Sequence, residues 1–155
     1  MQDKNTVGTE GIWREAILAE NSTIGQAIAN LEKVGIKIVL VGDKDNRLIG
    51  TISDGDIRRG LLKGLGLNSP ITSVVNHNAL VVTPEIARET VTQLMVANKI
   101  QQVPVVDGQQ EIVGLHLWDE INTLPARTNM VVIMAGGKGT RLMPHTQSCP
   151  KPMVL

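Results

Sequence analysis

The spacing of apolar residues in the first part of the chain predicts short helices that alternate with pairs of strands. From residue 24 to 34, apolar side chains recur every three or four positions, which is typical of a helix with one buried face. Ser22 and Thr23 precede this run as candidate N-caps. Two stretches rich in β-branched residues follow, and the polar residues 42–47 between them predict a hairpin. The expected elements are a helix over 24–34, strands over 37–41 and 48–52, and a short helix over 54–62.

This pattern is repeated once, at an offset of 64 residues and without a gap. A repeat that occurs only twice indicates a tandem pair of small units rather than an open array. Pro104 within the second strand pattern predicts an edge or a strand entry near a cleft. Matching residues include Ile36, Val39, Val41, Asp43, Gly50 and Ile57, which fall on Ile100, Val103, Val105, Asp107, Gly114 and Ile121. The second unit is expected to contain a helix from Pro84 to Asn98, strands over 102–106 and 111–115 around a turn at 107–110, and a helix over 117–123.

The last part of the chain has a different character. Residues 125–129 are polar and begin with a proline, which indicates a linker. The apolar run 130–134 is typical of a buried parallel strand, and a glycine-rich loop over 135–141 follows it. Because a nucleotide-binding sheet needs several such units, we expect residues 130–155 to be the N-terminal fragment of a longer domain. We also expect this fragment to be held by packing on the paired units or on a neighbouring chain.

The composition of the chain limits the kinds of molecule that the protein is expected to bind. The 155 residues carry 15 basic and 15 acidic side chains, so the electrostatic footprint of a nucleic-acid-binding protein is missing. The single cysteine, Cys149, excludes an internal disulfide framework, and His77, His116 and His145 lack the spacing of metal ligands. The sequence contains neither an apolar run of the about 18 residues that a membrane span needs nor a signal peptide. We therefore expect a cytoplasmic protein without nucleic-acid, membrane or metal partners.

The paired units resemble a tandem of CBS domains, known as a Bateman module. The resemblance rests on the repeat and on Gly50, Ser53 and Asp56, which match the ribose motif of that family in register. It implies an α+β fold of two β-α-β-β-α units related by pseudo-twofold symmetry, followed by an incomplete Rossmann-like strand and loop. The expected organisation is a tail over 1–10, a first unit over 11–68, a second unit over 69–124, a linker over 125–129 and the fragment 130–155.

The resemblance also implies that the first unit binds an adenine nucleotide. A carboxylate such as that of Asp56 can accept hydrogen bonds from both hydroxyls of a ribose. Arg58 and Arg59 follow directly and are suited to a phosphate. Alternatively, Asp54 or Asp56 caps the helix, and Arg58 and Arg59 lie on a face exposed to solvent. The sequence leaves both interpretations open. The candidate ligand-binding residues are Ile36, Ile38, Ile52, Ser53, Asp56, Arg58 and Arg59.

The second unit lacks this chemistry. Leu117 stands at the position of Ser53 and cannot form a hydrogen bond, and Glu120 is one methylene longer than Asp56. We therefore expect no ligand at the second motif, and we interpret His116, Trp118 and Asp119 as packing and surface residues.

Residues 130–155 resemble the opening signature of the sugar-nucleotide pyrophosphorylases, in the glycine-rich segment 136–144 and in the Pro-Lys-Pro-Met at 150–153. The resemblance implies that Arg141 holds a nucleoside triphosphate and that Lys151 contacts a phosphate. It also implies Mg²⁺, held by Asp residues further along the family's chain, so the fragment is not expected to be an enzyme by itself. The triphosphate loop would comprise Gly136, Gly137, Gly139, Thr140 and Arg141.

Together these features predict a regulatory module. The pair would sense AMP, ADP or ATP and modulate an attached sugar-1-phosphate nucleotidyltransferase, and it would form a homodimer through its helical faces. The alternative is a structural module that dimerises the same enzyme and binds no nucleotide.

Overall fold

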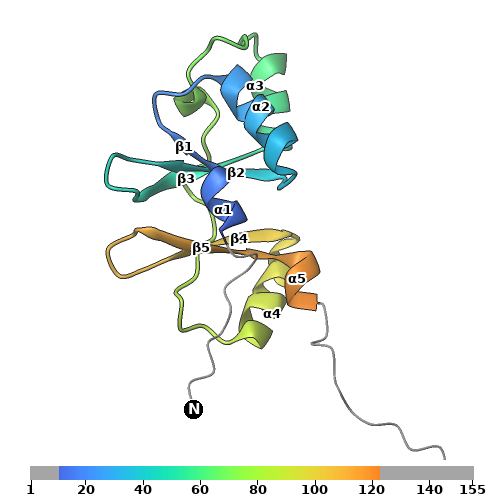
Figure 1. Ribbon diagram of the computed structural model, residues 1–155. Coiled ribbons are helices and arrows are strands. Elements are labelled where there is room, and N and C mark those ends of the chain that lie inside the picture. The colour runs from blue at the N-terminus through green and yellow to red at the C-terminus, as the bar shows by residue number, and fades with distance from the viewer. Residues whose placement is uncertain (1–10, 123–155) are drawn as a thin grey trace, which may run out of the picture. The chain divides into compact units, whose positions relative to one another are not determined.

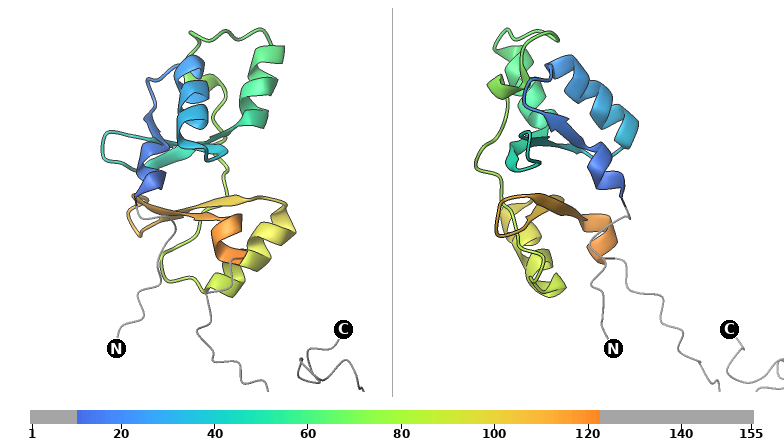
Figure 2. Two further views of the ribbon diagram at one scale, coloured as in Figure 1. Left: turned by 45° about the vertical axis from the view of Figure 1, so that its right-hand side comes forward. Right: turned by 60° about the vertical axis from the view of Figure 1, so that its left-hand side comes forward.

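The computed structural model describes residues 11–122, which form two small units of helices and strands (Figure 1). The mixed α+β character expected from the sequence is confirmed. Helices flank two sheets that face each other, so the order of layers is helix, sheet, sheet, helix (Figure 2). The elements are α1 (Ile12–Glu15), β1 (Ile17–Ala19), α2 (Ile24–Val34), β2 (Ile38–Gly42), β3 (Leu48–Ser53), α3 (Asp54–Leu62), the 3₁₀ turn η1 (Ile71–Ser73), α4 (Arg88–Asn98), β4 (Gln102–Val106), β5 (Ile112–Leu117) and α5 (Trp118–Asn122).

Strand β2 is buried on both faces, because side chains alternate between two apolar layers. Val39 and Val41 pack under α2 and α3. Ile38 and Leu40 point the other way, into the layer between the two sheets. In the antiparallel pairing of β2 with β3, Ile38 lies opposite Ser53, so Ser53 shares the face that looks toward the second unit.

The offset of 64 residues relates the 11-residue helix and the hairpin of one unit to those of the other. Helices α2 and α4 each have 11 residues and begin at positions 24 and 88. The hairpin registers also correspond, with Ile38 opposite Ser53 in the first unit and Gln102 opposite Leu117 in the second. Each hairpin has an irregularity at the same place, after Val41 and after Val105. The pseudo-symmetry of the two units therefore extends to the register of their strands.

The expected start of the fourth helix at Pro84 is wrong. The helix begins at Arg88, and the residues before it form a turn in which the Ile86 amide donates to the Thr83 carbonyl over 3.3 Å. The equivalent helix of the first unit begins after Thr23, whose side chain and that of Gln26 form a complete capping box. Ala87 stands at the position of Thr23 and has no side-chain cap, so the sequence carries no cap signal at the true boundary.

The two hairpin tips meet on the pseudo-twofold axis. The Leu48 amide donates to the Gln110 carbonyl over 2.9 Å, and the Ile112 amide donates to the Asn46 carbonyl over 3.0 Å. Each bond maps onto the other when 64 is added or subtracted. These reciprocal bonds join the turns of the two units into one backbone ladder.

A proline explains why the two sheets differ in width. In the first unit the Leu40 amide donates to the Ala16 carbonyl over 2.9 Å and helps to align β1 beside β2. Pro104 is the equivalent of Leu40 and has no N–H to donate. The parallel pairing of the second unit is reduced to one bridge, between Val82 and Val105. The edge position expected for Pro104 matches this arrangement.

Among residues 11–122, no helix combines the length and the apolar character needed to cross a membrane. The expected linker at 125–129, the fragment 130–155 and its packing lie outside the residues that the structure describes.

Candidate functional site

A cavity of about 330 Å³ lies between the two units. This volume falls at the lower end of the about 300–1,000 Å³ that small-molecule sites occupy. Its walls come from β2, β3 and the start of α3 in the first unit, from β4 and the end of α4 in the second, and from the segment that joins them. The lining residues are Lys37, Ile38, Thr51, Ser53, Asp56, Asn76, Ala79, Leu80, Lys99, Ile100, Gln101, Gln102 and Pro104.

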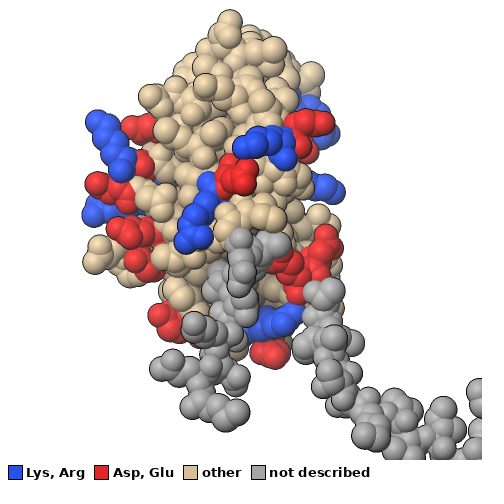
Figure 3. Space-filling view, in the orientation of Figure 1, with Lys and Arg blue, Asp and Glu red and all other residues tan. Residues whose placement is uncertain are grey.

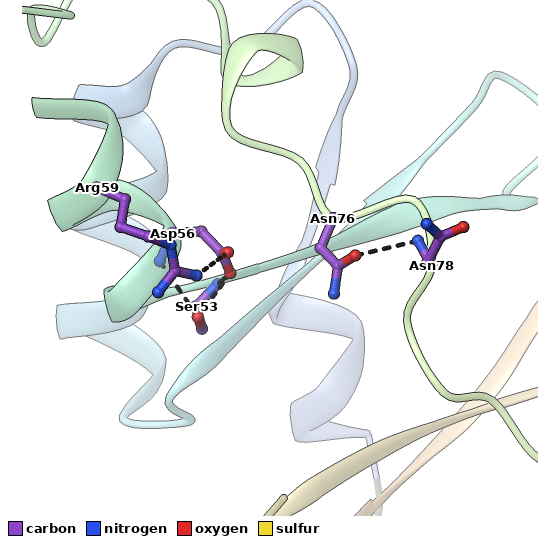
Figure 4. Close-up of polar contacts among 5 residues, drawn as sticks. All are labelled: Ser53, Asp56, Arg59, Asn76 and Asn78. Carbon is purple, nitrogen blue, oxygen red and sulfur yellow. Dashed lines mark hydrogen bonds and ion pairs between the residues drawn. The ribbon is translucent and has the colours of Figure 1, made fainter. Parts of the chain in front are cut away.

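Ser53 and Asp56 face each other where β3 passes into α3 (Figure 4). Ser53 is the N-cap of this helix, and Asp56 closes a capping box with it. The Asp56 carboxylate accepts hydrogen bonds from the Ser53 amide at 2.8 Å and from the Ser53 hydroxyl at 2.6 Å. Its other oxygen pairs with the Arg59 guanidinium at 2.6 Å. One of the two interpretations of these residues, a helix cap, is therefore present in the structure.

The capping box does not use all the hydrogen-bond acceptor positions of the Asp56 carboxylate. An ionised carboxylate has about four acceptor positions, and three donors approach that of Asp56. Arg59 has 67% of its side chain exposed, whereas Asp56 has only 18%, so the guanidinium holds the carboxylate from the solvent side. The carboxylate therefore has an acceptor position left for a further donor in the cavity. The capping box fixes this carboxylate at the cavity wall.

The rest of the cavity is divided between apolar and polar walls. Ile38 and Pro104 come from the facing strands β2 and β4, and Leu80 and Ile100 extend this apolar surface. Lys37 and Lys99 supply positive charge. Asn76 belongs to the segment between the units, and its side-chain oxygen accepts from the Asn78 amide at 3.1 Å (Figure 4). Such a site can hold a flat apolar ring, a polyol and an anion together.

Of the residues proposed from the sequence, Ile38, Ser53 and Asp56 line this cavity. Ile52 is fully buried in the core beneath α2 and α3, because it neighbours Ser53 on β3 and so faces the opposite side of the sheet. Ile36 is buried in the layer between the sheets and lines a different, smaller cavity. Neither Arg58 nor Arg59 is among the lining residues, and Arg59 reaches the site only through Asp56.

The walls that the second unit and the joining segment contribute are not predicted by the sequence motif. The repeat itself held a signal for some of them, since Gln101 and Gln102 are the equivalents of Lys37 and Ile38. Asn76, Ala79 and Leu80 lie in a segment without a repeat partner in the sequence pattern. They are placed by a bridge in which Thr51 and Asn76 exchange backbone hydrogen bonds of 3.1 and 2.9 Å.

A second cavity of about 100 Å³ lies at the pseudo-equivalent position. Leu117 is the equivalent of Ser53, and it lines the smaller cavity together with Trp118, so apolar side chains stand where the larger cavity has a hydroxyl. Up to Asn122, the last described residue, helix α5 has five residues, against nine in α3. The volume of this cavity is thus about a third of that of the larger one.

His116 lies on β5 beside this smaller cavity, and burial lowers its pKa below the ordinary value of 6.5. The carboxylate of Glu120 raises the pKa of His116 and so opposes the effect of burial, whereas the guanidinium of Arg88 lowers this pKa further. The folded protein therefore favours the neutral imidazole.

Acidification should destabilise the protein partly through His116. As the pH falls below 6.5, the unfolded chain takes up a proton at this residue before the folded chain does, so stability is lost down to the depressed pKa. Urea unfolding at about pH 7.5 and about pH 5.5 should show a smaller loss of stability in His116→Gln than in the original protein. An equal loss in both proteins would contradict this role for His116.

Comparison with protein families finds two matches. The family model described as "CBS domain" matches residues 13–63 and 71–115, which is more than half of the chain. The model described as "Nucleotidyl transferase" matches residues 130–155. The matched segments coincide with the paired units and with the glycine-rich fragment.

Curated relatives share the paired units. An uncharacterized protein of Rickettsia prowazekii is 30% identical over 103 residues, which cover 66% of this chain and 32% of that protein. The arabinose 5-phosphate isomerase GutQ of Salmonella typhi is 27% identical over 93 residues, or 60% of this chain and 29% of that enzyme. The chain thus spans about a third of the length of these relatives.

Solved structures show the same fold. A CBS domain protein from Pyrobaculum aerophilum, complexed with AMP, superposes with a TM-score of 0.63 at 23% identity, covering 71% of this chain and 85% of that one. CBSX2, also solved in complex with AMP, superposes with a TM-score of 0.60 at 18% identity and covers 68% and 82% of the two chains.

Proposed function

This chain belongs to the CBS-domain family, and on that premise we propose that its paired units bind an adenine nucleotide and regulate an attached nucleotidyltransferase. The cavity between the units carries the proposal. It places the carboxylate of Asp56, a group of apolar side chains and two lysines around one space of about 330 Å³. Neighbours of the same fold were solved with AMP.

The three parts of such a ligand have separate counterparts in the cavity. The ribose hydroxyls would donate to Asp56, because an ionised carboxylate forms stronger hydrogen bonds than a neutral acceptor. The adenine would lie against Ile38, Leu80 and Pro104. The phosphate would lie toward the lysines, which are the basic residues that line the space.

The activity that the nucleotide would regulate is assigned to the part of the chain that follows the paired units. Residues 130–155 match the nucleotidyl transferase model and contain the glycine-rich segment with Arg141 and Lys151. We propose that this activity acts on a sugar-1-phosphate, requires Mg²⁺ and belongs to the cytoplasm. The nucleotide can influence it only if the nucleotide binds two states of the protein with different affinities.

Calorimetric titration of the full chain with AMP, ADP, ATP and GMP tests the binding. We expect saturable heat with at least one adenine nucleotide at micromolar concentrations and a weaker response to GMP. No binding of any adenine nucleotide below about 1 mM, which corresponds to only about −4 kcal/mol, would overturn the proposal.

A second candidate function is a structural module that dimerises the enzyme. Exposed apolar side chains lie on α2, on α3 and in the loop after α3, at the end of the first unit whose surface in Figure 3 is largely without Lys, Arg, Asp or Glu. A second copy packing there would form the homodimer through the helical faces. Light scattering gives the mass in solution of the original chain and of Leu62→Lys. The structural module predicts a dimer for the original chain and a monomer for the variant, and a monomer in both cases would contradict it. The exposed residues are Ile28, Leu61, Leu62 and Leu67.

A further inference from the structure

Lys99 has an unusual backbone for a lysine. It ends α4 with φ 54° and ψ 42°, in the left-handed region that favours glycine. The equivalent residue of the first unit is Gly35, with φ 72° and ψ 2°. The same helix end is thus built with glycine in one unit and with lysine in the other.

This choice has a cost in stability. A side chain with a β-carbon clashes with the backbone in the left-handed region, so Lys99 is strained where Gly35 is not. Residues that keep such strained conformations cluster at ligand-binding sites. Lys99 is also exposed, so its side chain does not compensate by filling the core.

The position of Lys99 supplies the second observation. Lys99 lines the larger cavity, directly before Ile100, Gln101 and Gln102. Gly35 lines the smaller cavity at the equivalent place and brings no charge. The strained lysine therefore stands only where a nucleotide has room to bind.

Other cations are less well placed for a phosphate. Arg59 is engaged with Asp56 at 2.6 Å, and Arg58 does not line the cavity. Lys37 lines both cavities, so it does not mark the larger one. We propose that Lys99 binds the phosphate of the nucleotide, an inference that rests on the proposed function and differs from the expectation that the two arginines do so.

The test compares AMP with adenosine, which lacks the phosphate, on the full chain. Lys99→Gly should weaken AMP binding about tenfold, the loss expected for one charge-assisted hydrogen bond, and leave adenosine binding unchanged. The same variant should raise the Tm by a few degrees because it releases the backbone strain. Lys99→Arg should retain most of the affinity for AMP.

Gln110→Gly is the matched control. Gln110 also has a positive φ, of 66°, but it does not line the cavity. We expect this variant to be stabilised like Lys99→Gly and to bind AMP normally. Equal effects of Lys99→Gly on AMP and adenosine, or no effect on either, would overturn the inference alone. Failure of both ligands to bind the original protein would overturn the proposed function and the inference with it.

Discussion

Replacement of Asp56 by alanine is expected to lower the affinity for an adenine nucleotide by about a hundredfold. The variant loses the acceptor for both ribose hydroxyls, and hydrogen bonds to a charged group contribute about 1.5–3 kcal/mol each. Calorimetric titration measures the change directly. Because Asp56 also closes the capping box of α3, the same variant should lose about 1 kcal/mol of stability, which urea unfolding measures.

Two further variants separate binding from folding. Asp56→Asn keeps an oxygen that can cap the helix but removes the charge, so it should fold more stably than the alanine variant and still bind weakly. Asp54→Ala changes an exposed acid in the same first helical turn that does not line the cavity. It should bind like the original protein. Normal affinity in Asp56→Ala, or an equal loss in Asp54→Ala, would remove the assigned role of Asp56.

The largest expected effect on stability comes from Gly50→Ala. A β-carbon at Gly50 would stand 2.5 Å from the Asn76 carbonyl oxygen and 2.5 Å from a methyl group of Val75. The backbone bridge between Thr51 and Asn76 lies beside this contact, so the segment that joins the two units cannot move away without losing hydrogen bonds. We expect a loss of about 3 kcal/mol, at the upper end for overpacked sites, measured by urea unfolding.

Gly66→Ala is the control for this substitution. A β-carbon added at Gly66 would meet no atom of the described residues within 4 Å, and the backbone conformation there is accessible to alanine. The stability of this variant should stay within about 0.5 kcal/mol of the original, as for most surface changes. If Gly50→Ala unfolds at the same urea concentration as Gly66→Ala, the joining segment is not packed against β3 as described.

Much of the fold could be predicted because the chain contains the same unit twice. Local patterns alone extended the helix of the second unit back to Pro84, since Glu85, Ile86 and Ala87 are compatible with a helix. The repeat gives the better boundary, because the first helix begins at Ile24 and the offset of 64 leads to Arg88. Comparing the two copies therefore places the helix boundary more accurately than helix propensity does.

The candidate site could be predicted only in part. Ser53 and Asp56 were found because their spacing places both at one helix start. Assigning Ile52 to the same cleft overlooked the alternation of side chains along a strand, which sends neighbours to opposite faces. Asn76, Ala79 and Leu80 could not be predicted, because only the backbone bridge at Thr51 brings their segment to the cavity.

The location of the bound nucleotide tests the account most directly. Amide resonances of the full chain, followed by NMR during titration with AMP, report where the ligand binds. We expect the largest shifts among the amides of residues that line the larger cavity, namely Ser53, Asp56, Asn76, Ala79, Leu80 and residues 99–102. Saturable binding of AMP with its largest shifts at Leu117–Asp119, or outside both cavities, would contradict the account.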